Sequence, residues 1–380
     1  MMLRMVRIGK ADRPVDSAKP PLYTVNEWVT DHSVSVGRSA LPAWGQLLEA
    51  VSILIAVTGG TGHIGNVLVR ELVARGEQVR VLALPTEDTR PLDGLPIQIV
   101  PGDVLDPHSL EVAFHEADIV YHVAGLVSIF PWQEQSVDRV NLQGTINVLR
   151  ACEKAGVRRL IYTSSIHSLV EPPHGAVIDE SCGFDPERSR GGYDKSKARA
   201  SIEVLQAVER GLDAVIVCPT GVIGPFDFRV SIMGRVLLDL ARGSLWAIPD
   251  GGYDFVDVRD VATGHILAAE KGKPGEVYIL AGECISVADL ARMVDELRGR
   301  RPRSRLRLPA WLTRVIAHVS TAICLAFKVK SRITKYSVET LLSNCNISNA
   351  KARRELGYAP RSLRDSVRDS IQWFAENGVA

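Results

Sequence analysis

From residue 53 onward, short apolar runs alternate with stretches in which apolar residues recur every three or four positions. The runs are typical of strands buried on both faces, and the periodic stretches are typical of helices with one buried face. Strands are predicted at 53–57, 78–82, 97–100, 119–123, 159–162, 214–218 and 277–280. Helices are predicted at 62–75, 109–116, 137–155, 194–210, 230–242 and 261–270. This alternation predicts an α/β fold built on a doubly wound parallel sheet.

A glycine-rich turn, Thr58-Gly59-Gly60-Thr61-Gly62-His63-Ile64-Gly65, links the first predicted strand to the first predicted helix. Glycines permit a tight turn and let the backbone approach a pyrophosphate, whose charge rests on the helix N-terminus. Because strand, glycines and helix come in that order, we predict a Rossmann-type dinucleotide site on Gly59, Gly62, His63, Ile64 and Gly65. No Gly-Lys-Ser/Thr sequence follows, which excludes a P-loop.

Residues that follow the next strands are expected beside the same site, since the carboxyl ends of parallel strands line the ligand crevice. Asp103-Val104 follows the third strand, and we predict that Asp103 bonds the adenine amino group. Val123-Ala124-Gly125 ends the fourth strand, where the small residues leave room for the cofactor. The second strand ends Val81-Leu82-Ala83-Leu84-Pro85, without the acid typical of NAD sites or the arginine typical of NADP sites. The prediction is therefore NAD or NADP.

A tyrosine and a lysine four residues apart, Tyr193 and Lys197, lie on one face of a predicted helix. Lowering a tyrosine pKa from about 10 to about 7 takes roughly 4 kcal/mol, which a buried ammonium and a positive nicotinamide ring together supply. Tyr193 would then protonate the oxyanion formed when hydride reaches a carbonyl, while the Ser165 hydroxyl, at the end of the fifth strand, holds the oxygen. We therefore predict Ser165, Tyr193 and Lys197 as catalytic residues, and no metal site.

At this point the chain resembles the extended short-chain dehydrogenase/reductase superfamily, the group of NAD-dependent epimerases and dehydratases. The resemblance covers about residues 52–380 and is carried by 58–65, 102–104, 122–125, Asn141, 163–165, Tyr193 with Lys197, 219–225 and 256–261. It implies that Ser165, Tyr193 and Lys197 form the catalytic triad and that Lys197 also bonds the nicotinamide ribose. It further implies that Pro219 lies beside the nicotinamide and that the C-terminal part binds substrate.

Departures from the family patterns narrow the substrate class. Ser165-Ile166-His167 stands where sugar-nucleotide dehydratases have Thr-Asp-Glu, and 220–225 lacks the asparagine of sugar-nucleotide epimerases. Together with 121–125, that stretch looks more like the dihydroflavonol-reductase and 3β-hydroxysteroid-dehydrogenase branches, which act on bulky, largely apolar ketones or alcohols. An NAD(P)-dependent sugar-nucleotide epimerase is the alternative, and a cofactor sensor without catalysis is a third. His167 is read either as a substrate contact or as a polar loop residue.

The regular alternation ends near Pro219, and the 380 residues suggest two domains or one large unit with an added lobe. We predict a cofactor-binding Rossmann domain at 51–223, to which 253–280 returns. A smaller, mostly helical substrate lobe is predicted at 224–252 and 281–380. Residues 1–50 are predicted to be a poorly ordered extension, or to precede a natural start of translation near Val51.

Composition limits the partners. Lys and Arg total 45 against 44 Asp and Glu, which gives a formal charge of +1 and no basic excess for nucleic acid. Six arginines lie between 298 and 307, and their alternation with Ser304, Leu306 and Leu308 predicts a strand with one solvated face. The six scattered cysteines fit unpaired thiols in a reducing cytoplasm. A homodimer is compatible with the family, although no interface is visible in the sequence.

One apolar stretch leaves two interpretations open. Leu312, Val315, Ile316, Val319 and Ile323 form a helical stripe between Trp311 and Phe327, and Lys328, Lys330, Arg332 and Lys335 follow it. Such a stripe usually packs in a core, here that of the substrate lobe. The basic residues after it are typical of a helix lying on a membrane surface.

Overall fold

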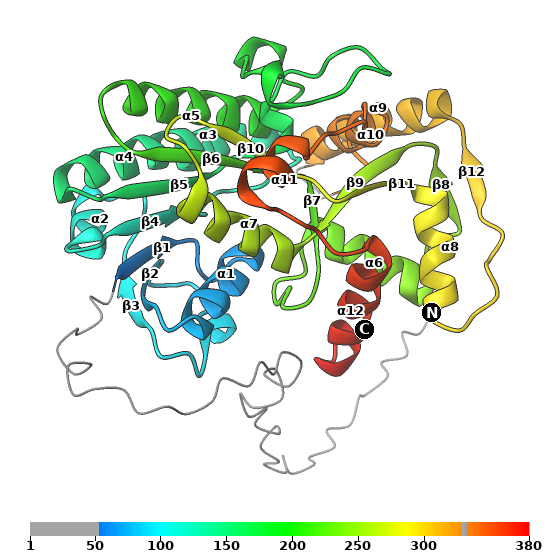
Figure 1. Cartoon of the computed structure of the whole chain (residues 1–380). Coiled ribbons are helices and arrows are strands. Elements are labelled where there is room, and N and C mark those ends of the chain that lie inside the picture. The colour runs from blue at the N-terminus through cyan, green and yellow to red at the C-terminus, as the bar shows by residue number, and fades with distance from the viewer. Residues whose placement is uncertain (1–52, 328–330, 332, 380) are drawn as a thin grey trace, which may run out of the picture. The chain divides into compact units, whose positions relative to one another are not determined.

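The computed structural model describes residues 53–327, 331 and 333–379, and the predicted extension at 1–50 lies outside them. The description below concerns the described residues of the unit Ser52–Ala380 (Figure 1).

The core of this unit is a seven-stranded parallel sheet, in the order β10-β6-β5-β4-β1-β2-β3. Its strands are β1 (Leu54–Thr58), β2 (Gln78–Ala83), β3 (Gln98–Pro101), β4 (Ile119–His122), β5 (Arg159–Thr163), β6 (Ala214–Pro219) and β10 (Val277–Leu280). Each predicted strand is present to within one or two residues, and the predicted α/β class is confirmed. The strand order reverses between β1 and β4, which is where such sheets bind ligands.

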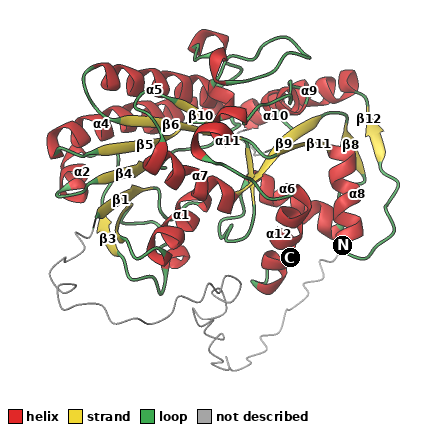
Figure 2. Cartoon of the chain, viewed as in Figure 1, coloured by secondary structure: helices red, strands yellow, loops and turns green. Residues whose placement is uncertain are grey.

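Helices cover both faces of the sheet (Figure 2). The helices on one face are α1 (His63–Ala74) and α7 (Val258–Lys271), with α11 (Ala350–Leu356) packed against α7. Those on the other are α2 (Pro107–Phe114), α4 (Gly144–Ala155) and α5 (Gly192–Glu209). The helix predicted at 137–155 is continuous but compound, because α3 (Glu134–Asp138) and a π-helical turn at Arg139–Gln143 precede α4.

A second group of elements lies beyond the carboxyl end of this sheet. The small strands are β7 (Gly221–Ile223), β9 (Gly252–Asp257) and β11 (Glu283–Ser286) in one sheet, and β8 (Ala247–Pro249) with β12 (Leu306–Leu308) in another. The helices are α6 (Ile232–Arg242), α8 (Val287–Leu297), α9 (Ala310–Phe327), α10 (Lys335–Leu341) and α12 (Leu363–Glu376). Of the stretch 253–280, β9 thus lies in the three-stranded sheet, whereas α7 and β10 belong to the large one.

The structure corrects the sequence interpretation of the arginine-rich segment. Arg305 is not part of a solvated face, because its guanidinium donates to both carboxylate oxygens of Asp295, at 2.8 and 3.1 Å. The two side chains are 5% and 1% exposed. Asp295 lies on α8, so the pairing arises from tertiary packing that the alternation along the chain does not encode.

The structure also corrects the interpretation of the cysteines. Cys284 on β11 and Cys345, after α10, form a disulfide across 61 residues of sequence. Cys152, Cys182, Cys218 and Cys324 are free. Because no local spacing marks this pair, only the fold brings the two thiols together.

Candidate active site

The glycine turn between β1 and α1 has the geometry of a phosphate-binding loop. Gly59 has a φ of +74°, and a Cβ atom on it would lie 2.6 Å from the backbone nitrogen of Ala124. A Cβ atom on Gly65 would lie 2.0 Å from the carbonyl oxygen of Gly59. No side chain caps α1 at Gly62, so the N–H groups of its first turn remain available to an anion. The turn therefore fits the pyrophosphate of NAD or NADP.

His63 and Ile64, which the sequence also assigns to this site, lie in the first turn of α1 and are partly exposed. The Nε2 atom of His63 is 2.9 Å from the carbonyl oxygen of Pro225, after β7. This contact ties the glycine turn to the segment that follows the sixth strand of the sheet. Pro219, at the end of that strand, is buried.

The adenine side of the predicted site is the loop after β3. The Oδ1 atom of Asp103 accepts a hydrogen bond from the backbone N–H of Leu105 at 2.9 Å, which fixes the carboxylate. Val104 is buried, and its carbonyl oxygen accepts from Asn147 of α4 at 3.1 Å. The structure thus holds Asp103-Val104 rigidly at the carboxyl end of the sheet.

The loop after β4 is held against both the glycine turn and α5. The backbone N–H of Val123 donates to the carbonyl oxygen of Thr58 at 3.2 Å. A Cβ atom on Gly125 would lie 3.3 Å from both the Nζ atom of Lys197 and the Oδ1 atom of Asn141. Sequence reasoning quoted Asn141 only within a family motif. Its side chain bonds Leu126 in both directions and the Ser196 hydroxyl, so it fixes this loop beside Lys197.

The structure brings Ser165, Tyr193 and Lys197 together at the carboxyl end of β5. The Ser165 hydroxyl interacts with the Tyr193 phenol and favours the ionised form of that phenol. Lys197 lies one helical turn after Tyr193 on α5, and its Nζ atom donates to the carbonyl oxygen of Thr163 at 2.7 Å. A hydroxyl, a phenol and an ammonium therefore converge beside the glycine turn, which suits proton transfer to a substrate oxygen.

Burial dominates the electrostatics of this group. Lys197 is 4% exposed, and burial lowers its pKa to about 8. Burial raises the pKa of Tyr193 to about 12, against the hydrogen bond from Ser165, which lowers it. At neutral pH the lysine is thus charged and the tyrosine protonated, the state in which the phenol acts as a general acid.

A cavity of about 420 Å³ borders Tyr193. The loop after β4 contributes Ile129 and Phe130 to its wall, and α3 contributes Val137. Thr321 of α9 and Tyr336 of α10 line it from the opposite group of elements. The cavity therefore lies between the cofactor side and the C-terminal helices, with apolar side chains near the Tyr193 phenol.

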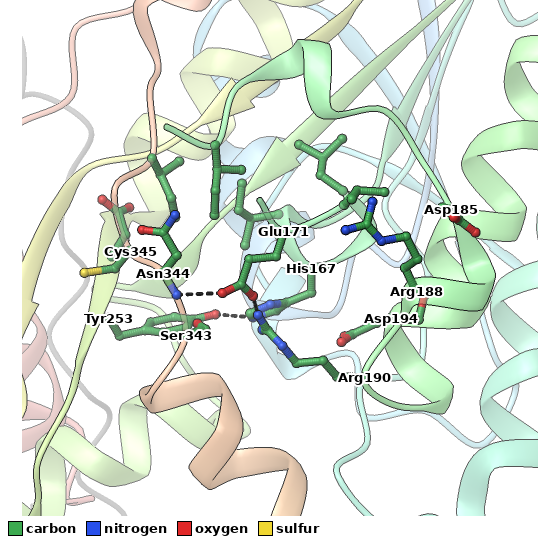
Figure 3. A pocket seen from close by; sticks show the side chains of 17 residues that line it. His167, Glu171, Asp185, Arg188, Arg190, Asp194, Tyr253, Ser343, Asn344 and Cys345 are labelled. Carbon is green, nitrogen blue, oxygen red and sulfur yellow. Dashed lines mark hydrogen bonds and ion pairs between the residues drawn. The ribbon is translucent and has the colours of Figure 1, made fainter. Parts of the chain in front are cut away.

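A second, smaller cavity lies behind this group, and Figure 3 shows His167 and Tyr253 pointing toward one another in it. The His167 Nε2 atom is 2.5 Å from the Tyr253 hydroxyl, and burial lowers the pKa of His167 to about 4. Tyr336 donates to Asp194 at 2.6 Å, and burial raises the pKa of that carboxyl to about 6. Tyr336 was not predicted from the sequence, because it lies outside every motif that was recognised there.

Among the described residues, no cluster of His, Cys, Asp and Glu is arranged to hold a metal ion.

Residues 55–281 match the model of the NAD dependent epimerase/dehydratase family. The chain is 37% identical to "Sterol demethylase protein B" of Methylococcus capsulatus, over 85% of this chain and 98% of that protein. It is 33% identical to a "Putative dihydroflavonol 4-reductase" of Synechocystis, over 85% of this chain and 94% of that protein.

Among solved structures, that of gox2253 superposes with a TM-score of 0.77 at 36% identity, covering 86% of this chain and 99% of that one. A family match over more than half of the chain, relatives along most of its length and the observed sheet order agree with one another. The protein belongs to the NAD-dependent epimerase/dehydratase family.

Proposed function

We propose that this protein transfers hydride between NAD or NADP and a carbonyl or alcohol carbon of a bulky, largely apolar small molecule. The observation that carries the proposal is the convergence of Ser165, Tyr193 and Lys197 at the carboxyl end of β5, with Tyr193 in the wall of a cavity to which Ile129, Phe130 and Val137 also contribute. Two of the relatives are named for a sterol and for a dihydroflavonol, both polycyclic molecules.

Each residue of the group has a distinct task in the proposed reaction. NAD(P)H, when bound, supplies the hydride. Tyr193 donates its proton to the substrate oxygen as negative charge develops there, and Ser165 donates a hydrogen bond to the same oxygen. Lys197 holds the nicotinamide ribose, and its charge, together with that of the oxidised nicotinamide when the cofactor is bound, opposes the rise in the pKa of the phenol that burial causes. In the reverse direction, Tyr193 accepts the alcohol proton.

The cofactor lies along the carboxyl edge of the sheet in this proposal. Gly59, Gly62, His63, Ile64 and Gly65 hold the pyrophosphate, and Asp103-Val104 holds the adenine. Val123, Ala124, Gly125 and Pro219 border the nicotinamide half. Residues 224–252 and 281–380 form the substrate lobe. A cytoplasmic location, a homodimer and a lack of nucleic-acid binding stay predictions.

The test is a titration of the purified protein with NADH and NADPH, followed by nicotinamide fluorescence, and then by a panel of aromatic and alicyclic ketones. Ketone-dependent loss of the reduced nicotinamide is expected, and Tyr193→Phe is expected to lower the rate by a factor of about 10² or more while cofactor still binds. Binding without oxidation by any ketone, together with turnover of UDP- or dTDP-sugars, would instead establish the epimerase. Unchanged function in Tyr193→Phe would favour the cofactor sensor.

A further inference from the structure

The helix α9 presents a row of large apolar side chains to solvent. Its exposed residues are Trp311, Val315, Val319, Ile323, Leu325 and Phe327, each between 48% and 73% exposed. We call this set the α9 face. Positions 311, 315, 319 and 323 are each one turn apart and form a continuous row. The interpretation of the predicted stripe as core packing is therefore wrong for Val315, Val319 and Ile323, whereas Leu312 and Ile316 are half-buried. So much contiguous apolar surface marks an interaction site.

The opposite side of α9 is attached to the protein through small and polar residues. Thr313, Ala317 and Cys324 are the buried positions of the helix. Arg314 forms an ion pair with Glu339 of α10, at 2.9 Å. The backbone N–H of Lys335 donates to the Thr321 hydroxyl at 2.8 Å.

Among the described residues, α9 is long and apolar enough to cross a membrane, judged by length and composition alone. These contacts instead hold it side-on against α10, with one face bound to protein and the other free (Figure 1). That arrangement is typical of a helix that lies in the plane of a membrane interface.

The sequence of α9 and of the segment that follows it carries only basic charges, although Glu339 of α10 pairs with one of them, Arg314. Between residues 310 and 335 the sequence contains Arg314, Lys328, Lys330, Arg332 and Lys335, and no aspartate or glutamate. In the segment that leads into α9, Arg301, Arg303 and Arg307 are exposed. Basic residues beside an amphipathic helix attract anionic lipid headgroups, at about 1 kcal/mol for each cation near the surface. Trp311 at the start of the helix suits the headgroup level, where tryptophan is enriched.

The helix α9 reaches the cavity at Tyr193 through one residue. Thr321 lines that cavity, and Leu325 of the α9 face lies one turn further along the same side of the helix. Lys335, at the start of α10, lines the cavity and is also exposed. A molecule that leaves the lipid along α9 would thus arrive at the catalytic phenol without crossing the sheet.

We propose that the α9 face docks on a bilayer surface that contains anionic phospholipid, and that apolar substrate enters the cavity from this lipid. A second copy of the chain is the competing occupant of an apolar face. A symmetric contact through α9 would bring two basic segments together, because each partner presents the same patch. Anionic lipid has the complementary charge, which is why it is the occupant inferred here. The inference of docking depends only on the exposed residues and charges of α9, whereas the inference that substrate enters from the lipid rests on the proposed function.

The docking is tested by co-sedimentation with vesicles of phosphatidylcholine containing phosphatidylglycerol, compared with phosphatidylcholine alone. We expect the full chain to bind the anionic vesicles, and high salt to weaken the binding. Val319→Glu is expected to lower the bound-to-free ratio about tenfold or more, because it removes apolar burial and adds a charge that the lipid repels. Val112→Glu is the matched control, since Val112 is 50% exposed on α2, away from α9, and Val319 is 57% exposed.

Circular dichroism verifies that both variants are folded. Protein that stays in the supernatant with anionic vesicles would refute the docking, and so would equal binding by Val319→Glu and Val112→Glu. A dimer in light scattering that Val319→Glu dissociates, with no vesicle binding, would assign the face to a second copy instead.

Entry of substrate is tested with a ketone dissolved in the vesicles and a water-soluble ketone in parallel. We expect Val319→Glu to lower kcat/KM about tenfold for the first and to leave the second unchanged. Equal loss on both ketones, or on neither, would overturn the entry route. If no ketone oxidises the cofactor, the proposed function fails, while the sedimentation result still decides the docking.

Discussion

Replacing Lys197 by methionine is expected to stabilise the protein while it removes the proposed reductase activity. The Lys197 side chain is 4% exposed, and burial lowers its pKa from 10.5 to about 8. Within the described residues, its side chain donates a hydrogen bond to the carbonyl oxygen of Thr163 and lies over the ring of Tyr162, 5.0 Å from the ring centre. The folded protein thus holds a charge that its own surroundings disfavour, which is expected of a group that serves a cofactor.

The size of the effect follows from the pKa. A fall from 10.5 to about 8 corresponds to about 3 kcal/mol, at roughly 1.4 kcal/mol for each pKa unit. Methionine is apolar and of similar length, so it avoids this cost but leaves the Thr163 carbonyl without its donor, at about 1 kcal/mol. The net gain at pH 7 is about 2 kcal/mol in the free energy of unfolding. With an unfolding entropy of about 2 cal/mol/K per residue, that raises the Tm of a unit of this size by about 3 °C.

The gain should depend on pH in a definite direction. The folded pKa, about 8, lies below the unfolded value of 10.5, so between these values the unfolded chain holds a proton that the folded chain has released. Unfolding of the wild type therefore becomes less favourable as pH rises through this window. The advantage of Lys197→Met is full below pH 8 and shrinks as pH rises. Above about pH 10.5 it becomes a deficit of about 1 kcal/mol, because the neutral lysine still donates to the Thr163 carbonyl and methionine does not.

Urea unfolding followed by fluorescence at pH 7 and pH 10, without cofactor, measures both quantities. Lys195→Met is the matched control, because Lys195 lies two residues away on α5, is 45% exposed and pairs with Glu187 at the surface. This control should change the free energy of unfolding by less than about 0.5 kcal/mol. A Lys197→Met protein that is less stable than the wild type at pH 7, or a difference that does not shrink toward pH 10, would refute the reasoning.

Two further predictions concern the glycine turn and the buried ion pair. Gly59→Ala should weaken NADH or NADPH binding at least about tenfold, because its φ is +74° and the added Cβ would meet Ala124 at 2.6 Å. Gly76→Ala, at a φ of +83° with open space around it, should cost about 1 kcal/mol of stability and leave cofactor binding unchanged in the same fluorescence titration. Arg305→Met should lower the free energy of unfolding in urea by about 3–5 kcal/mol, since it leaves the Asp295 carboxylate buried without its cation. Adding Asp295→Asn should restore part of the loss, and a cost below about 1 kcal/mol for Arg305→Met would contradict the assignment.

The large sheet could be predicted from the sequence because its strands are buried on both faces. Ile55, Ala56 and Val57 of β1 are all nearly inaccessible to solvent, and such strands appear as unbroken apolar runs. The strands of the two small sheets have three to six residues and mixed exposure, for example β11 and β12. Length alone does not separate the two cases, because β3, β4 and β10 of the large sheet also have four residues. The strands of the small sheets lack the regular alternation with helices, so these sheets follow from tertiary contacts.

The same distinction applies to the candidate site. Residues such as Tyr193 and Lys197 lie in compact motifs, and one helical turn places them together. The contacts that hold them come from distant segments: Asn141 reaches Ser196 across 55 residues, and Tyr336 reaches Asp194 across 142. No spacing rule relates such pairs. A single sequence therefore predicts the candidate catalytic residues but not the distant residues whose hydrogen bonds position them.

The stripe on α9 shows why apolar periodicity alone does not establish burial. A period of 3.6 shows which residues share a face of the helix. The usual inference that an apolar face packs inside the protein assumes that this face would otherwise contact water, and it leaves out contact with lipid. In α9 the buried side consists of Thr313, Ala317 and Cys324, while Trp311 and Phe327 are exposed. Small residues let a helix approach its neighbour closely, so the packed side of α9 is the side of its small residues and not that of its large ones. The sequence also contains a run of basic residues from Lys328 to Lys335 directly after α9. Packing of a helix in a core does not require such a run. The exposure of the large apolar residues and the basic residues beside them together favour lipid contact for the outer face of α9. Either observation alone is compatible with core packing as well as with a helix on a membrane surface.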